Sequence, residues 1–117
     1  MGVLVTGGTG ALGSAVLREL IEAGYEVTTT WIVERERERV ESEHGSEVAL
    51  VQADLTSPEG AEDAVAAVDG LEAVANLVGG FMAGPKLHEI EPADFERIMR
   101  LNVFTAFNVA RAAMPVL

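Results

Sequence analysis

Residues 3–13 read Val3-Leu4-Val5-Thr6-Gly7-Gly8-Thr9-Gly10-Ala11-Leu12-Gly13, and this stretch decides the fold. An apolar run leads into a glycine-rich turn, and apolar residues at helical spacing follow the turn. Gly8, Gly10 and Gly13 fit the spacing G-x-G-x-x-G, in which the glycines permit a tight turn, close approach of a pyrophosphate and close packing of helix on strand. The stretch therefore predicts a strand, a phosphate-binding turn and a helix.

The predicted turn places a ligand at the first turn of a helix. Backbone N–H groups there lack partners within the helix, and the positive end of the helix dipole lies behind them, so the site favours an anion. A glycine-rich turn that binds no ligand is the simpler alternative. The strand before the turn and the helix after it favour the dinucleotide interpretation over that alternative.

Composition limits the classes of function. The chain has 117 residues, enough for one domain spanning 1–117 with its own core. It has no cysteine, which excludes disulfides and thiolate metal sites and makes the cytoplasm the expected location. A net charge of −11 argues against nucleic acid or an anionic membrane as partner. No apolar stretch is long enough to be a membrane span, and no signal peptide is recognisable.

Strands and helices are expected to alternate along the whole chain. Apolar runs followed by glycine or polar turns predict a parallel sheet whose strands are covered by helices on both faces. The fold class is therefore α/β, a Rossmann-like doubly wound sheet with strand order 3-2-1-4. The expected strands are 2–6, 25–31, 47–53 and 71–78, and the expected helices are 11–23, 33–43, one starting at Pro58, and 92–114.

The segment after the second strand alternates Glu and Arg, which predicts a solvated helix with i, i+4 ion pairs. In dinucleotide-binding folds the choice between NAD and NADP is made near this position. Trp31 ends the strand and Glu34 is the nearest carboxylate, whereas Arg35 or Arg37 would suit a ribose phosphate. The preference between NAD and NADP therefore stays open.

Four motifs resemble the N-terminal half of a short-chain dehydrogenase/reductase. The cofactor turn is similar to the form with glycines at Gly7, Gly10 and Gly13, and an acidic-aliphatic pair follows the third strand. An Asn-x-Ala-Gly-like motif, with valine for alanine, follows the fourth strand, and Asn102 corresponds to the family's asparagine in the last helix. The resemblance implies cofactor contacts from Gly7, Gly8, Thr9, Gly10, Leu12, Gly13, Trp31, Asp54, Leu55, Asn76, Val78 and Gly79, and a relay position at Asn102.

The resemblance also implies roles for these motifs. Asp54 would accept a hydrogen bond from the adenine amino group, Asn76 would lie near the ribose, and the backbone carbonyl of Asn102 would hold a water in a proton relay. Each residue has a plainer interpretation when taken alone. An aspartate can cap a turn, and an asparagine can satisfy backbone groups at a strand end or inside a helix.

The family's catalytic tyrosine, the lysine four residues after it and the orienting serine lie beyond the segment that the resemblance covers. The chain has one tyrosine, Tyr25, and one lysine, Lys86, far from that spacing. The resemblance therefore implies an NAD(P)-binding domain of an oxidoreductase, truncated relative to the full family fold and catalytically incomplete as written. A non-catalytic nucleotide-binding regulatory module and a self-assembling fragment are the alternatives. His44 and His88 are isolated, so no metal site is predicted, and both are expected at the surface.

The fourth strand would be an edge of the sheet, and an open apolar edge invites pairing with another chain. The last helix is apolar over more than one stripe, as in a helix that is deeply buried or contacts a partner. Self-association through the strand from Leu71 to Val78 or the helix from Pro92 to Met114 is therefore expected.

Overall fold

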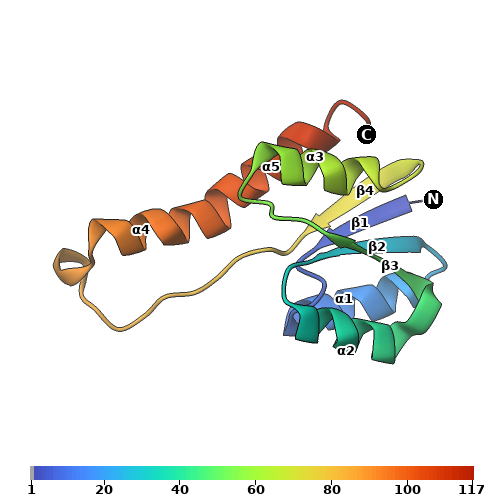
Figure 1. Cartoon of the computed structure of the whole chain (residues 1–117), viewed down its shortest axis with the longest axis horizontal. Helices are drawn as coiled ribbons and strands as arrows, with labels where there is room; N and C mark the ends of the chain where they lie inside the picture. Colours follow the sequence, from blue (N-terminus) through green and yellow to red (C-terminus); the bar gives the residue numbers. More distant parts are fainter. Residues whose placement is uncertain (1) are drawn as a thin grey trace.

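A parallel four-stranded sheet forms the centre of the molecule (Figure 1), in a computed structural model that describes residues 2–117. The strand order is β3-β2-β1-β4, which confirms the predicted order. In the middle of the sheet, Leu4 of β1 pairs with Thr28 of β2 on one side and with Val74 of β4 on the other. The strands are β1 (Gly2–Thr6), β2 (Glu26–Trp31), β3 (Val48–Gln52) and β4 (Leu71–Asn76).

Helices cover both faces of the sheet (Figure 1): α1 (Ala11–Glu22) and α2 (Glu34–His44) lie on one face, and α3 (Pro58–Ala66) and α5 (Thr105–Ala113) lie on the other. Side chains alternate along a strand, so β1 serves both layers. Val3 and Val5 pack in a cluster with α1 and α2, while Leu4 packs with α3 and α5. The central strand therefore links two apolar cores.

Local signals explain where the helices begin and why α2 forms. Ser57 caps α3 by accepting a hydrogen bond from the Gly60 N–H at 3.0 Å, and Pro58 follows at the first helical position. In α2, Arg37 pairs with Glu41 at 2.8 Å and also with Glu34. The predicted solvated helix with its ion pairs is confirmed. The helix is nevertheless anchored to the core, through the buried Val40.

Two predictions about the outer strands were wrong, and one apolar residue of α1 lies outside its buried face. The outer strands β3 and β4 are half-exposed along much of their length, because edge strands lack a neighbour and the helices cover them only partly. The predicted end of β4 at Val78 is also two residues too long. Leu12, one of the apolar residues at helical spacing after the glycine turn, is 66% exposed. The buried residues of that helix are Gly13 and Leu17, one turn apart on one face, and Leu12 points away from that face.

Residues 80–104 form an arm that projects from the body (Figure 1). The chain leaves β4, runs through an extended connection, and returns along α4 (Pro92–Met99) and a π-helical segment (Arg100–Phe104) into α5. The prediction of one regular helix over 92–114 was wrong in its middle. The π-helical segment is centred on Asn102, and an insertion of this kind widens a helical turn locally.

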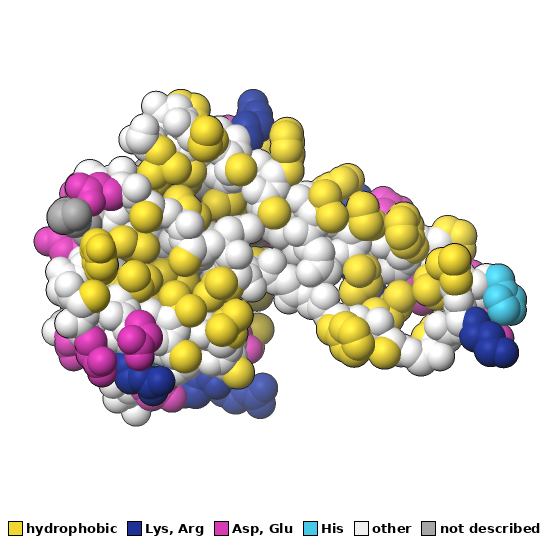
Figure 2. Space-filling view, turned by 180° about the vertical axis from the view of Figure 1, so that it is seen from behind, with side chains coloured by type: hydrophobic (Ala, Val, Ile, Leu, Met, Phe, Trp, Pro, Cys, Tyr) yellow, Lys and Arg dark blue, Asp and Glu magenta, His cyan; other side chains and the backbone are white. Residues whose placement is uncertain are grey.

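The arm exposes large apolar side chains (Figure 2). Phe81 is 90% exposed and Phe107, where the arm joins the body, is 63% exposed. The last helix was expected to be either deeply buried or in contact with a partner. Deep burial does not hold for the part of it that lies in the arm. Within residues 2–117, no helix is long and apolar enough to cross a bilayer.

Candidate functional site

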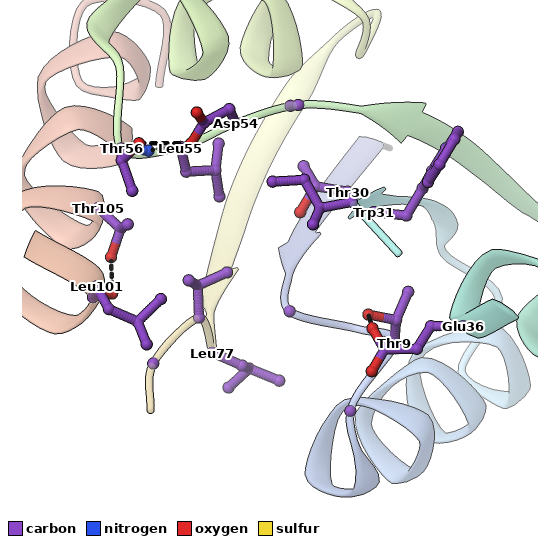
Figure 3. A pocket seen from close by; sticks show the side chains of 16 residues that line it. Thr9, Thr30, Trp31, Glu36, Asp54, Leu55, Thr56, Leu77, Leu101 and Thr105 are labelled. Carbon is purple, nitrogen blue, oxygen red and sulfur yellow. Dashed lines mark hydrogen bonds between the residues drawn. The ribbon is translucent and has the colours of Figure 1, made fainter. Parts of the chain in front are cut away.

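A cleft of about 310 Å³ opens at the carboxyl ends of the four strands (Figure 3). In doubly wound sheets this edge is where ligands bind, and the volume is at the lower end of that of small-molecule pockets. Figure 3 shows Thr9 and Glu36 on one side and Leu101 and Thr105 on the other. The cleft is lined by Gly7, Thr9, Gly10, Thr30, Trp31, Ile32, Glu36, Ala53, Asp54, Leu55, Thr56, Leu77, Val78, Gly79, Leu101 and Thr105.

The glycine-rich turn is built so that only glycine fits at several positions. Gly7 has φ +74°, and a Cβ there would lie 2.9 Å from the carbonyl carbon of Leu77. A Cβ on Gly13 would lie 2.3 Å from the Gly7 oxygen, and one on Gly8 would lie 2.2 Å from Thr29 Oγ1. Gly8 and Gly13 do not line the cleft. They bring strand and helix close enough to shape the turn.

The first turn of α1 is electrostatically open toward the cleft. Gly10 is the residue before the helix, no side chain caps it, and the first turn contains no acidic residue. The Gly10 N–H bonds to the Gly7 oxygen at 3.2 Å, which closes the turn. Gly10 also lines the cleft. An anion in the cleft would therefore lie at the positive end of the helix dipole.

Asp54 lies at the opposite end of the cleft, just after β3. Its Oδ1 accepts hydrogen bonds from the Thr56 N–H at 3.0 Å and from the Thr56 hydroxyl at 2.6 Å. These bonds stabilise the carboxylate, so the pKa of Asp54 is lowered, mainly by the Thr56 hydroxyl. The turn-capping role is present, and both Asp54 and the buried Leu55 line the cleft as well.

The residues of the motif after β4 have different positions: one joins two strands, and the others line the cleft. Asn76 accepts a hydrogen bond from the Thr6 hydroxyl, and the Leu77 N–H bonds to the Thr6 oxygen at 2.9 Å. Asn76 thus ties β4 to β1 and does not line the cleft, as in the plainer interpretation of a strand-end asparagine. Val78 and Gly79 do line it, together with Leu77, which sequence reasoning missed.

Asn102 binds the chain that leaves the cleft. Its Oδ1 accepts from the Gly80 N–H at 3.0 Å, and its Nδ2 donates to the Gly80 oxygen at 3.1 Å and the Ile98 oxygen at 2.9 Å. A Cβ on Gly79 would lie 2.6 Å from Asn102 Oδ1. The side chain is therefore a clamp between the π-helical segment and the strip after β4. It does not line the cleft.

The end of β2 differs from expectation. Trp31 lines the cleft as predicted, but Arg37 stacks over its ring, 5.4 Å from the centroid, and lines no part of the cleft. The carboxylate that faces the cleft is Glu36, whose Oε2 accepts from the Thr9 hydroxyl at 3.0 Å. Sequence reasoning named Glu34, Arg35 and Arg37 and missed Glu36, because only the rotation of α2 about its axis distinguishes them.

No group of three or more His, Asp or Glu side chains in residues 2–117 is arranged to hold a metal ion. His88 is exposed as expected, but the prediction that His44 is a surface residue was wrong. The His44 side chain is 12% exposed, and its Nε2 lies 3.8 Å from Glu43 Oε2. Its position at the end of α2, against the body, explains the burial.

Comparison with known proteins identifies the family. The chain matches the family model for short chain dehydrogenase over residues 2–117. It is 33% identical to a tropinone reductase homolog of Arabidopsis thaliana, covering 100% of this chain and 47% of that protein. Its fold matches a blue fluorescent protein from a metagenomic library in complex with NADPH, with TM-score 0.88, 26% identity and coverage of 99% and 51%.

A second solved structure, an NADH-dependent reductase complexed with NAD, matches with TM-score 0.85 at 25% identity, over 99% of this chain and 51% of that chain. The chain spans about half the length of the curated relatives it matches. The match of the family model covers every described strand and helix, including the glycine turn and the clamp at Asn102. The chain belongs to the short-chain dehydrogenase family.

Proposed function

We propose that residues 1–117 form the dinucleotide-binding domain of an NAD(P)-dependent oxidoreductase. The observation that carries the proposal is the glycine turn at the start of α1, which opens on a cleft that crosses the carboxyl ends of the strands. A pyrophosphate at the uncapped helix end would bind backbone N–H groups. Solved relatives with NADPH or NAD bound support the same ligand class.

The fit of a dinucleotide can be judged from the space at Gly10. A Cβ there would meet only the Gly7 oxygen, at 3.6 Å, so the surface next to Gly10 is open. The pyrophosphate would lie against Gly7, Thr9 and Gly10. The adenine would then lie between Leu55 and Asp54 at one end, and the strip of Val78 and Gly79 would be next to a ribose. When bound, the nicotinamide ring supplies the hydride acceptor or donor.

Calorimetric titration of the chain with NAD and with NADP tests this proposal. Saturable binding of either cofactor, at one site per chain, is the expected result. Binding without turnover of simple carbonyl substrates is expected from the chain as written and would fit a regulatory nucleotide-binding module equally well. A folded chain that binds neither cofactor overturns the proposal. The remaining alternative is then a self-assembling fragment that binds no nucleotide.

We also propose that copies of the chain associate through the arm. The arm and the start of α5 expose Phe95, Val103, Phe104 and Phe107, an apolar surface of a kind that usually meets a partner. The edge of β4 is a weaker candidate, because it carries the exposed Glu72 and charged residues discourage edge pairing. Sedimentation velocity at micromolar concentration tests this, and a single monomeric species contradicts it.

The cytoplasmic location expected from the cysteine-free sequence also remains a proposal. Fractionation of cells that make the chain tests it, with the chain expected in the cytosolic fraction.

A further inference from the structure

The end of the cleft beside β2 is closed by a contact between the glycine turn and the first turn of α2. Thr9, from the glycine turn, donates its hydroxyl hydrogen to Glu36 Oε2 at 3.0 Å. Glu36 comes from the first turn of α2, and Trp31 and Ile32 complete this end of the cleft. Figure 3 shows the Glu36 and Thr9 side chains facing each other. A carboxylate is thus held at the end of the cleft nearest the glycine turn.

The charge that faces the cleft is negative. Among residues 2–117, no Lys, Arg or His lines it, and its two charged side chains are Glu36 and Asp54. Two arginines of α2 near this end of the cleft are held in other contacts. Arg37 is held over Trp31 and by its ion pairs with Glu34 and Glu41, and Arg39 donates to the Thr9 backbone oxygen.

The position of Glu36 fits the ribose of an adenosine bound across the turn. In dinucleotide-binding folds an acidic residue roughly 20 residues after the glycine turn accepts hydrogen bonds from the ribose 2′-hydroxyl, whereas an arginine accommodates a 2′-phosphate. A carboxylate accepts well from a hydroxyl. A 2′-phosphate carries a charge of about −1.5 to −2 at neutral pH, and it would meet a second negative charge here.

We propose that Glu36 makes this domain selective for NAD(H) over NADP(H). The adenosine 2′-hydroxyl donates to the Glu36 carboxylate and replaces the Thr9 hydroxyl as its partner, and the same carboxylate repels a 2′-phosphate. The inference rests on the proposed function, because it assigns a preference to the same cleft. It answers the choice that the Glu-Arg alternation of the sequence left open between Arg35, Arg37 and Glu34.

The experiment is calorimetric titration of the full chain with NAD and with NADP, for the unmodified protein, Glu36→Gln and Glu38→Gln. Glu36→Gln removes the charge but keeps an acceptor for the Thr9 hydroxyl, so the contact with Thr9 and the fold should survive. Glu38→Gln makes the same charge change on the same helix, at a residue that does not line the cleft. Circular dichroism confirms that each variant is folded.

The unmodified chain should bind NAD at least tenfold more tightly than NADP. Glu36→Gln should reduce this ratio at least fivefold, mainly by tightening NADP, and Glu38→Gln should leave it within twofold. The ratio of the unmodified chain should also narrow as salt rises from about 0.05 to 0.5 M, because salt screens the repulsion of the 2′-phosphate.

Failure of this inference is distinguishable from failure of the proposed function. If NAD or NADP binds but the ratio is the same in Glu36→Gln and the unmodified chain, the role of Glu36 is wrong and the domain assignment stands. A preference for NADP in the unmodified chain also overturns the inference, and it would mean that Arg35 or Arg39 reaches the phosphate. If neither cofactor binds to the folded chain, the proposed function is wrong and the selectivity falls with it.

Discussion

Replacing Gly10 with alanine separates cofactor binding from folding. Gly10 has φ −83° and ψ −178°, an extended conformation that alanine adopts freely, and the added Cβ would meet the Gly7 oxygen at an ordinary 3.6 Å. Alanine is a poorer residue than glycine before a helix, by about 0.5–1 kcal/mol. Alanine also lowers the conformational entropy of the unfolded chain, which stabilises the folded state by a similar amount, about 0.4–1 kcal/mol. The free energy of unfolding should therefore change by less than about 0.5 kcal/mol.

The same methyl group projects where the pyrophosphate is expected to approach the backbone. We expect the affinity for the preferred cofactor to fall at least tenfold, which corresponds to about 1.4 kcal/mol. Urea unfolding followed by circular dichroism measures the first quantity, and calorimetric titration measures the second. An affinity within twofold of the unmodified chain, at unchanged stability, would refute the placement of the pyrophosphate at Gly10.

Gly13→Ala is the matched comparison, because it should act in the opposite way. A Cβ on Gly13 would lie 2.3 Å from the Gly7 oxygen and 2.5 Å from the Gly8 Cα, well inside normal contact distance. Strand and helix must then separate, at a cost of about 1–3 kcal/mol in unfolding free energy. If Gly13→Ala were as stable as the unmodified chain, the close packing at the turn would be wrong.

Three further changes test the rest of the site and the arm. Thr56→Val should raise the pKa of Asp54, measured by NMR, because it removes the hydroxyl that chiefly lowers this pKa. The lowered pKa contributes stability above the unfolded-state pKa of Asp54, and this stability is lost as pH falls through the folded-state pKa. The pH-dependent contribution to stability should therefore be smaller in the variant. Asn102→Ala should cost about 1–2 kcal/mol in urea unfolding, since it frees the Gly80 N–H and oxygen, and an unchanged midpoint would contradict the clamp. Phe107→Lys should shift sedimentation toward monomer, and an unchanged distribution would exclude this part of the arm from the contact.

The parts of the fold that follow from local signals were predictable from the sequence. The glycine turn, the alternation of apolar runs with polar turns, and the Ser57-Pro58 helix start each depend on a few neighbouring residues. Strand order then follows from the handedness of the crossovers. Accordingly the sheet order and most of the residues expected at the cleft, from Gly7 and Gly10 to Asp54 and Gly79, lie where the sequence indicated.

What could not be predicted depends on the rotation of a helix or on a distant partner. In α2, glutamates lie at 34, 36 and 38, and only the docking of Val40 into the core turns Glu36 toward the cleft. Asn102 was recognised as a polar residue in an apolar helix, but its bonds to Gly80 cross 22 residues of chain, and it lies in the middle of a π-helical segment. No local pattern encodes either contact.

The arm and the cleft share one stretch of chain, so their properties are linked. Leu101 and Thr105 line the cleft, while Phe104 and Phe107, on other sides of the same turns, are exposed. The clamp at Asn102 ties this stretch to the strip after β4 that carries Val78 and Gly79. A partner that covers the phenylalanines would contact the same helical turns that form this wall of the cleft. Any effect of association on cofactor affinity must therefore be matched by an equal effect of the cofactor on association, since linkage between two binding equilibria is reciprocal.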